Sequence, residues 1–425
     1  MLSDETLRRV LPAGAVALLG DVIRAVIWGL VVVVWIAFLQ VYARMFRLTL
    51  ADPTHSDFTI FYYTARMIAD GLPMYGESPA RYGVTWAADH LGNLNPPHVQ
   101  LLFLPLASLS YAPALAAFVA VSAVALGLSI WLVVREIEIG WSWRLFWFGG
   151  ALTISSAAFT TVAVTSELTF LLMVPFTLAW SAWRRERWTA AGAWLGVCAS
   201  VKLFVFLFVP VLVWQRRWKA LGACAAACAA VVLVGMSCFG AESYLQWTMT
   251  LGRVGWWWLP MNASWQGFVS RVLQGSASIE PVAHMEWLVK PLAMTGSTAI
   301  ACAAVWLVRS RSLALHERDR SMLLTFLGAI LASPLGWVYY LPLAYGPLVG
   351  WLSAEHWGVL RNSSRRWLII LFVALAFLYV PQEVAASIPD NALATVTIAS
   401  AYFWGVLLLS LAATRPTTVP IHDPR

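Results

Sequence analysis

One aromatic segment near the start of the chain carries several acidic side chains: Asp52, Asp57, Asp70, Glu77 and Asp89. Asp57 differs from the others because the stretch SDFTIFYYTARMI places it at the head of an apolar, aromatic segment with a helical pattern. A carboxylate at that position can cap the helix and interact favourably with its dipole. It can also act as a general base that takes a proton from an incoming hydroxyl. The residues by themselves leave both interpretations open.

Two other charged residues lie among apolar ones. Lys202 stands between the short apolar runs 189–201 and 203–214. Because a charge inside a membrane is costly, Lys202 either snorkels to an interface or faces a polar cavity, and we favour the cavity. Glu167 is predicted near the outer end of a helix pair, as a second acid or as an interfacial residue, and we favour the interface.

The composition decides which kind of structure must position these residues. Of the 425 residues, 60% are hydrophobic and 12% are charged, and the mean hydropathy is +0.72. A soluble chain carries roughly 25% charged residues. We therefore predict an all-α polytopic membrane protein. The first apolar run exceeds the ~7–15 residues of a cleavable signal core, so we expect it to be a retained helix.

The charge and the cysteines point to no further partner. The net charge of +7 does not imply nucleic acid, because basic residues beside membrane spans set the orientation of the chain. All five cysteines fall in apolar runs, which predicts buried free thiols. Acids and histidines show no metal-site spacing, so we expect no metal and no other cofactor.

Apolar runs bounded by charged or turn-forming residues predict about twelve spans in a single membrane domain, residues 1–425. The runs lie near 18–43, 112–134, 145–164, 168–183, 189–201, 203–214, 220–239, 284–308, 321–333, 337–353, 367–386 and 393–413. A cytoplasmic N-terminus places most arginines and lysines of the loops in the cytoplasm. It also leaves two long non-cytoplasmic segments, 44–110 and 240–283.

Three details of this topology matter for the site. Segment 44–110 contains Asp57 and is expected to form short amphipathic helices along the membrane face. Segment 189–214 is too short for two ordinary spans, so we predict a hairpin of short or re-entrant helices with Lys202 at its tip. Segment 240–283 contains Trp256, Trp257 and Trp258, whose rings either lie at the membrane interface, which we favour, or stack on a sugar.

Five short motifs follow one another in a defined order between Asp57 and Tyr340. They read D-F-x-x-[FY]-Y-x-x-A, G-x-P-x-Y, N-P-P, a lone lysine in an apolar hairpin, and S-P-x-x-W. The residues that carry them are Asp57, Phe58, Phe61, Tyr62 and Ala65; Gly71, Pro73 and Tyr75; Asn95, Pro96 and Pro97; Lys202; and Ser333, Pro334 and Trp337. In this order the motifs resemble those of glycosyltransferase family 87, which includes polyprenol-phosphate-dependent mannosyltransferases. The order is the specific signal, since each motif is short.

The resemblance implies a GT-C-type helical bundle with its active site at the non-cytoplasmic face. It implies inverting transfer of a sugar, a mannose-like hexose or a pentose, from a polyprenyl-phosphate donor to a glycolipid or glycan acceptor. Asp57 takes the position of the family's catalytic acid. The departing phosphate then needs a cationic partner, for which Lys202, Arg253 and Arg271 are the candidates.

The chain departs from the family pattern in two places. The histidine that usually follows S-P-x-x-W is absent, and Tyr339 and Tyr340 stand there instead. A tyrosine hydroxyl can replace the hydrogen bond of a histidine but not its titration near neutral pH. The family's G-Q-x-N element reads TSELT here, which introduces Glu167.

These observations together predict a multi-pass glycosyltransferase of the bacterial plasma membrane, in contact with membrane lipid. Asp57 is the predicted catalytic residue. The predicted substrate-binding residues are Tyr62, Arg66, Lys202, Asn262, Arg271, Trp337, Tyr339 and Tyr340. A transporter or flippase for a lipid-linked or amphiphilic substrate is the alternative, because a polar membrane cavity would also serve it.

Overall fold

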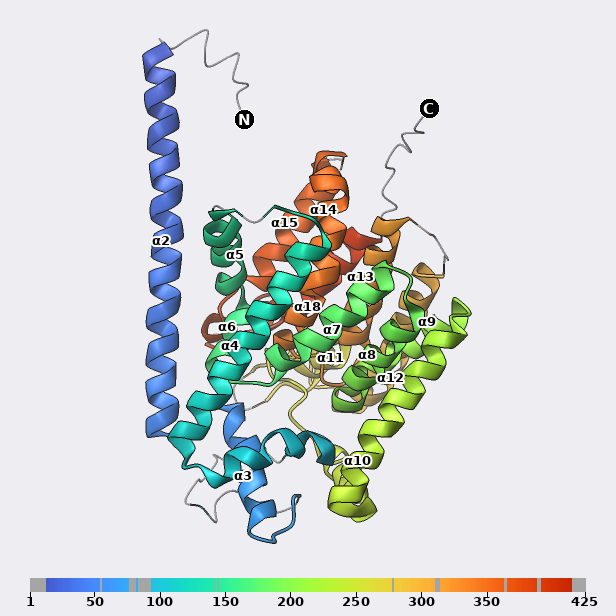
Figure 1. Cartoon of the computed structure of the whole chain (residues 1–425). Coiled ribbons are helices and arrows are strands. Elements are labelled where there is room, and N and C mark those ends of the chain that lie inside the picture. The colour runs from blue at the N-terminus through green and yellow to red at the C-terminus, as the bar shows by residue number, and fades with distance from the viewer. Residues whose placement is uncertain are drawn as a thin grey trace.

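The computed structural model describes the chain over residues 13–53, 56–75, 82, 93–140, 142–143, 145–276, 279–309, 314–362, 365–387 and 391–414. These ranges form helices joined by short connections, and they contain two isolated β-bridges but no strand. The all-α prediction is confirmed. Figure 1 shows a compact helical bundle with one long helix, α2 (Ala13–Ala51), along its edge.

Within these ranges, four helices are long and apolar enough to cross a membrane: α2, α4 (Tyr111–Glu136), α10 (Trp218–Leu251) and α12 (Glu286–Leu307). A fifth span is possible if the pair Phe146–Ser155 and Ala157–Thr165, bent by 75°, counts as one. The chain is an integral membrane protein, but the count of about twelve spans is not supported. Several predicted spans are short helices, whereas the bilayer core requires ~20 residues.

The remaining elements lie among and beside these long helices (Figure 1). They are α3 (Asp57–Ala69), η3 (Pro97–Leu102), η4 (Leu104–Ser108), the π-helical η5 (Leu145–Gly149), α5 (Gly150–Ser155), α6 (Ala157–Thr165), α7 (Thr169–Arg184), α8 (Trp188–Val201), η6 (Leu203–Leu207), α9 (Phe208–Trp214), α11 (Trp265–Leu273), α13 (Leu315–Ala332), η7 (Val338–Ala344), α14 (Tyr345–Asn362), α15 (Arg365–Leu378), α16 (Gln382–Ala386), α17 (Ala392–Val396) and α18 (Ala401–Ala413).

Helix α2 extends beyond the span predicted at 18–43. Its 39 residues correspond to about 58 Å of helix, so its last turns occupy the start of the predicted segment 44–110. Most of its side chains are exposed, as expected of a helix that faces lipid. One anchor to the bundle is Trp35, whose indole Nε1 donates to the Trp147 carbonyl at 3.2 Å and whose ring stacks on Phe146.

The hairpin predicted at 189–214 is present and packs tightly. Helix α8 ends at Val201, Lys202 has extended backbone angles, and the chain returns through η6 and α9. Helix α8 lies directly on α10, because a Cβ on Gly192 would come within 2.0 Å of the Ala220 carbonyl oxygen. Small residues at such contacts allow membrane helices to approach closely.

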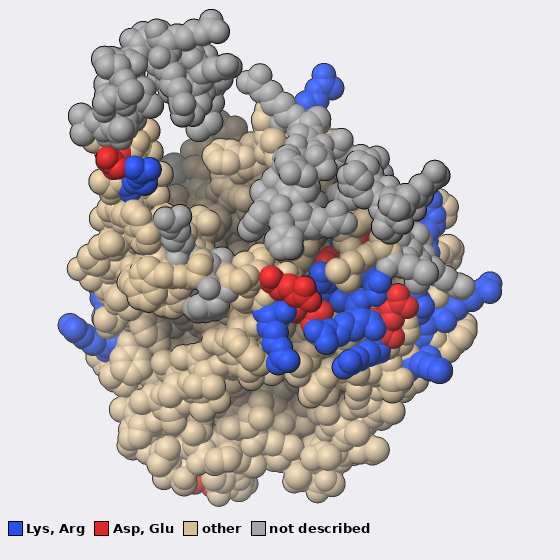
Figure 2. Space-filling model, turned by 45° about the horizontal axis from the view of Figure 1, so that its top comes forward, with Lys and Arg blue, Asp and Glu red and all other residues tan. Residues whose placement is uncertain are grey.

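Charged residues gather at one end of the bundle, the end that faces the viewer in Figure 2. Here Arg184, at the C-terminus of α7, places its Nε 3.1 Å from Oδ1 of the fully buried Asp319 on α13. Its Nη1 also donates to the Glu136 carbonyl at 3.1 Å, which adds the end of α4 to this group of charged residues. Three helices that are far apart in the sequence are thus joined at this end.

Candidate active site

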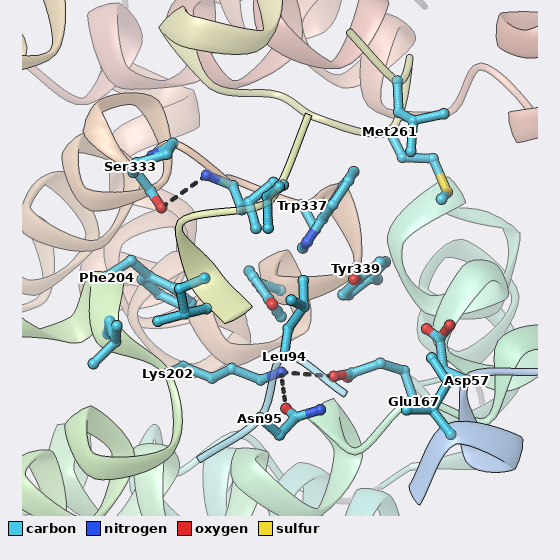
Figure 3. Close-up of a pocket in the computed structure, with 18 of the residues that line it drawn as sticks. Asp57, Leu94, Asn95, Glu167, Lys202, Phe204, Met261, Ser333, Trp337 and Tyr339 are labelled. Atoms are coloured by element: carbon cyan, nitrogen blue, oxygen red, sulfur yellow. Dashed lines mark hydrogen bonds and ion pairs between the residues drawn. The ribbon is translucent and has the colours of Figure 1, made fainter. Parts of the chain in front are cut away.

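A cavity of about 330 Å³ lies near the end of the bundle where α3 and the last turns of α10 are found. Ligand pockets of proteins commonly begin at about this size. Its polar lining includes Asp57, Asn95, Glu167, Lys202, Ser333, Tyr339 and Tyr340, and its apolar lining includes Phe204, Trp247, Leu251, Trp256 and Trp337 (Figure 3). The cavity therefore combines a few charged groups with a large apolar surface.

Asp57 is the first residue of α3, and the structure separates its two possible roles. The helix cap is Ser56, whose Oγ accepts from the Phe58 amide at 3.2 Å and donates to the Thr165 carbonyl at 2.7 Å. The half-buried carboxylate of Asp57 has no hydrogen bond or ion pair to any described residue, and it lines the cavity. Asp57 is not needed as the cap, so it is free to contact a ligand.

The surroundings of Asp57 raise the pKa of its carboxyl group to about 7. Burial is the largest cause, because a charged carboxylate loses its hydration there. The nearby carboxylate of Glu167 raises the pKa further, and the ammonium of Lys202 opposes the shift. A group with this pKa can be ionised at neutral pH and can still accept a proton readily.

Lys202 extends from the hairpin tip into the cavity and is 9% exposed. Its Nζ lies 3.0 Å from Oε1 of Glu167 and donates to Oδ1 of Asn95 at 3.2 Å. The ammonium also lies 4.9 Å from the centroid of the Tyr340 ring, within cation–π range. The cavity interpretation of Lys202 is therefore confirmed.

Glu167 connects this cation to the start of α7. Its second oxygen, Oε2, accepts from the Thr169 amide at 2.6 Å and also from the Thr169 hydroxyl. The residue is 3% exposed, so the interfacial interpretation that we favoured from the sequence is wrong. The sequence of a turn does not show whether a polar residue in it is buried. The burial of Glu167 depends on the hairpin at 189–214, whose Lys202 contacts it.

Three aromatic rings form a stack along one wall of the cavity. The rings of Trp256 and Trp337 have centroids 5.5 Å apart and an interplanar angle of 22°. Tyr339 continues the stack, 5.7 Å from Trp337 at 18°. Trp256 thus lines the cavity together with the S-P-x-x-W segment, although the sequence favoured an interfacial position for it.

Two predicted binding residues of α3 lie away from the cavity. The hydroxyl of Tyr62 donates to the Leu109 carbonyl at 2.7 Å, and Arg66 donates to the Ala107 carbonyl at 2.9 Å. Neither side chain lines the cavity. Both join α3 to the segment that precedes α4. They therefore fix the position of α3, whose first residue is Asp57.

Asn262 and Arg271 also bind the protein itself. The Asn262 amide nitrogen donates to the carbonyls of Trp257 and Pro334, at 3.0 and 2.9 Å. The fully buried Arg271 donates from Nη1 to the Leu259 carbonyl at 2.9 Å. These contacts support the loop that carries Trp256 without lining the cavity. Arg253, a third candidate cation, is exposed and also lies outside the lining.

The lining of the cavity contains residues that the sequence predicts for the site and others that it does not mark. Asp57, Lys202, Trp337, Tyr339 and Tyr340 were predicted, and the fold brings all five together. Asn95 belongs to the recognised N-P-P motif but received no role. Trp247 also lines the cavity, where its indole donates to the Leu94 carbonyl at 2.9 Å, and no sequence signal distinguishes it from the many other tryptophans.

The model of glycosyltransferase family 87 matches residues 93–335, more than half of the chain. Asp57 precedes the matched range, whereas Asn95, Glu167, Lys202 and Ser333 fall inside it.

A curated relative aligns with part of the chain. It is a polyprenol-phosphate-mannose-dependent alpha-(1-2)-phosphatidylinositol pentamannoside mannosyltransferase of Mycobacterium tuberculosis (strain CDC 1551 / Oshkosh), 29% identical over 199 residues. The alignment covers 45% of this chain and 43% of the relative. No solved structure gives a significant match. On the strength of the family match, the chain belongs to glycosyltransferase family 87.

Proposed function

We propose that this membrane protein transfers a sugar from a polyprenyl-phosphate donor to a hydroxyl group of a lipid or glycan acceptor, with inversion at the anomeric carbon. The observation that carries the proposal is the free carboxylate of Asp57, which faces a largely apolar cavity beside a buried cation. The relative's dependence on polyprenol-phosphate-mannose supports the donor class.

Asp57 acts as the general base. Its carboxylate takes the proton of the acceptor hydroxyl while the acceptor oxygen forms a bond to the anomeric carbon. On the opposite side of that carbon, the bond to the phosphate oxygen breaks and the electron pair leaves with the polyprenyl phosphate. The pKa of about 7 suits this step, because the base is ionised in part at neutral pH and binds the proton strongly.

Lys202 stabilises the departing phosphate. The leaving group gains one negative charge as the bond breaks, and a buried ammonium interacts with that charge more strongly than it would in water. Of the described residues that line the cavity, Lys202 is the one that carries a positive charge. The prenyl chain would lie along the apolar part of the lining, which includes Leu203, Phe204 and Leu251.

The cavity would face the non-cytoplasmic side of a bacterial plasma membrane. Glu167 precedes the N-terminus of α7, and Arg184 belongs to its last turn, so they lie about 24 Å apart along the helix. Arg185 and Arg318 lie beside Arg184, where Arg185 pairs with Glu136 and Arg318 donates to the Arg184 carbonyl. Basic residues of this kind are expected at the cytoplasmic side.

Tyr339 and Tyr340 take the place of the family histidine beside the reacting groups. A hexose such as mannose or a pentose would be held against these rings and Trp337. The four predicted binding residues outside the cavity, Tyr62, Arg66, Asn262 and Arg271, would influence substrate binding through the walls that they support.

The test is transfer of radiolabelled sugar from synthetic polyprenyl-phosphate donors by the purified protein in detergent. We expect Asp57→Asn to reduce the turnover rate about 100-fold or more. Asp70→Asn is the matched control, because Asp70 lies at the other end of α3, is exposed, and accepts a hydrogen bond from Tyr82. Full activity of Asp57→Asn would exclude Asp57 as the base. Translocation of labelled donor without sugar transfer, measured with the protein reconstituted in liposomes, would indicate a transporter.

A further inference from the structure

Among the described residues that line the cavity are two carboxylates and one ammonium group, and one of these carboxylates is paired with the ammonium. Lys202 contacts Glu167 at 3.0 Å, whereas Asp57 has no ion pair within the described part of the chain. In Figure 3, Glu167 lies between Lys202 and Asp57. The pairing is not dictated by charge, since either acid could attract the cation.

Geometry explains why Glu167 holds the ammonium. Ser166 has a left-handed backbone (φ 52°), which ends α6 and turns the chain so that Glu167 precedes α7. The Thr169 amide at the start of α7 then fixes Oε2, which leaves Oε1 directed at Lys202. The positive end of the helix dipole stabilises a carboxylate at this place.

We propose that Glu167 is a positioning residue that holds Lys202 away from Asp57. The ammonium then stays where the departing phosphate would lie, and Asp57 remains free to take the proton of the acceptor. This inference rests on the proposed function of the cavity. It concerns a residue that this chain has where the family's G-Q-x-N element reads TSELT.

The charged and titratable groups that face Asp57 come from three places. Glu167 lies between α6 and α7, Lys202 between α8 and η6, and Tyr339 and Tyr340 in η7. Loss of the Glu167 charge would release the ammonium toward the remaining carboxylate. Asp57 would then be occupied by an ion pair and would be a weaker base.

The pH dependence of sugar transfer tests this role. We expect Glu167→Gln, which keeps the size of the side chain and an acceptor for Thr169, to shift the acidic limb of kcat/KM to lower pH by about one unit. We also expect kcat at the plateau to fall about tenfold, because a weaker base takes the proton less readily. Glu383→Gln, an exposed acid of α16 outside the cavity lining, is the control and should leave both unchanged.

The double variant Glu167→Gln/Lys202→Met separates positioning from a purely structural role. With the ammonium removed, nothing cationic in the described lining can pair with Asp57, so the acidic limb should return to the wild-type position or higher. An acidic limb that does not move in Glu167→Gln would overturn the proposal, as would a limb that stays low in the double variant.

A second measurement does not require activity. Dicyclohexylcarbodiimide modifies protonated carboxyl groups, and mass spectrometry of the peptide that contains Asp57 reports its protonation at each pH. We expect half-maximal modification at lower pH in Glu167→Gln than in the wild type, in protein that elutes as a single species in detergent. If the wild-type protein transfers no sugar but half-maximal modification still occurs at lower pH in Glu167→Gln than in the wild type, the proposed function fails and the positioning role stands. The same half-maximal pH in both proteins refutes the positioning role.

Discussion

The backbone of Asn262 pairs with that of Trp337 in an isolated antiparallel bridge, and the Asn262 side chain extends this link. Its Oδ1 accepts from the amides of Ser264 and Gly336, at 3.2 and 3.0 Å. Its Nδ2 donates to the carbonyls of Trp257 and Pro334. One buried side chain thus joins the two segments that carry the aromatic stack of the cavity.

Asn262→Ala should therefore destabilise the protein more than it alters the chemistry. Loss of these hydrogen bonds leaves buried backbone groups unpaired, which costs about 2–3 kcal/mol. We expect a lower thermal unfolding midpoint and a higher KM as the wall that carries Trp256 and Trp337 loosens. Asn262→Asp keeps both bonds to Oδ1 but places an acceptor oxygen against the carbonyls of Trp257 and Pro334 at a buried site, so it should be at least as destabilising as alanine. A wild-type midpoint for Asn262→Ala would contradict the structural role.

The activity should depend on pH through Asp57. The base works only when ionised, and its pKa is raised to about 7, so kcat/KM should be highest above this pH and fall as the pH drops through about 7. An unperturbed aspartate would keep its activity down to about pH 4. Rates measured between pH 5 and 9 with a fixed donor check this. Activity that is constant down to pH 5 would exclude the raised pKa.

Lys202 and Glu167 should be coupled in stability. Lys202→Met leaves the carboxylate of Glu167 buried without its cation, at a cost of about 3–5 kcal/mol. The double variant Lys202→Met/Glu167→Gln removes both charges, so we expect it to be more stable than Lys202→Met alone. Thermal unfolding of the wild type, Lys202→Met, Glu167→Gln and the double variant gives the coupling energy between the two charges. Additive effects would show that the two charges do not interact.

The contact between α8 and α10 should tolerate no added carbon at Gly192. A Cβ there would come within 2.0 Å of the Ala220 carbonyl oxygen, so the helices must separate, at a cost of about 1–3 kcal/mol. Gly192→Ala should lower the thermal midpoint and, because α8 carries Lys202 at its end, also the activity. Gly222→Ala on α10 is the control, since nothing lies within 4 Å of its added Cβ. Equal midpoints for the two variants would refute the close packing.

The sequence by itself determined the class of the protein and most of its helices. Apolar runs have a local signature, so α4 and α12 begin and end within about two residues of the predicted runs 112–134 and 284–308. The order of the motifs singles out Asp57 and Lys202, and both residues line the cavity. The number of spans was not predictable in this way, because an apolar run does not show whether it crosses the membrane or ends inside the bundle.

Only the tertiary structure decided what each polar residue contacts. It made Ser56 the cap of α3, left Asp57 without a partner among the described residues, and paired Glu167 with Lys202. It also directed Asn262 and Arg271 to backbone carbonyls instead of the cavity. The physical reason is that hydrogen bonds and ion pairs form between segments far apart in the sequence. Their partners therefore depend on helix packing, which a local pattern of residues does not encode.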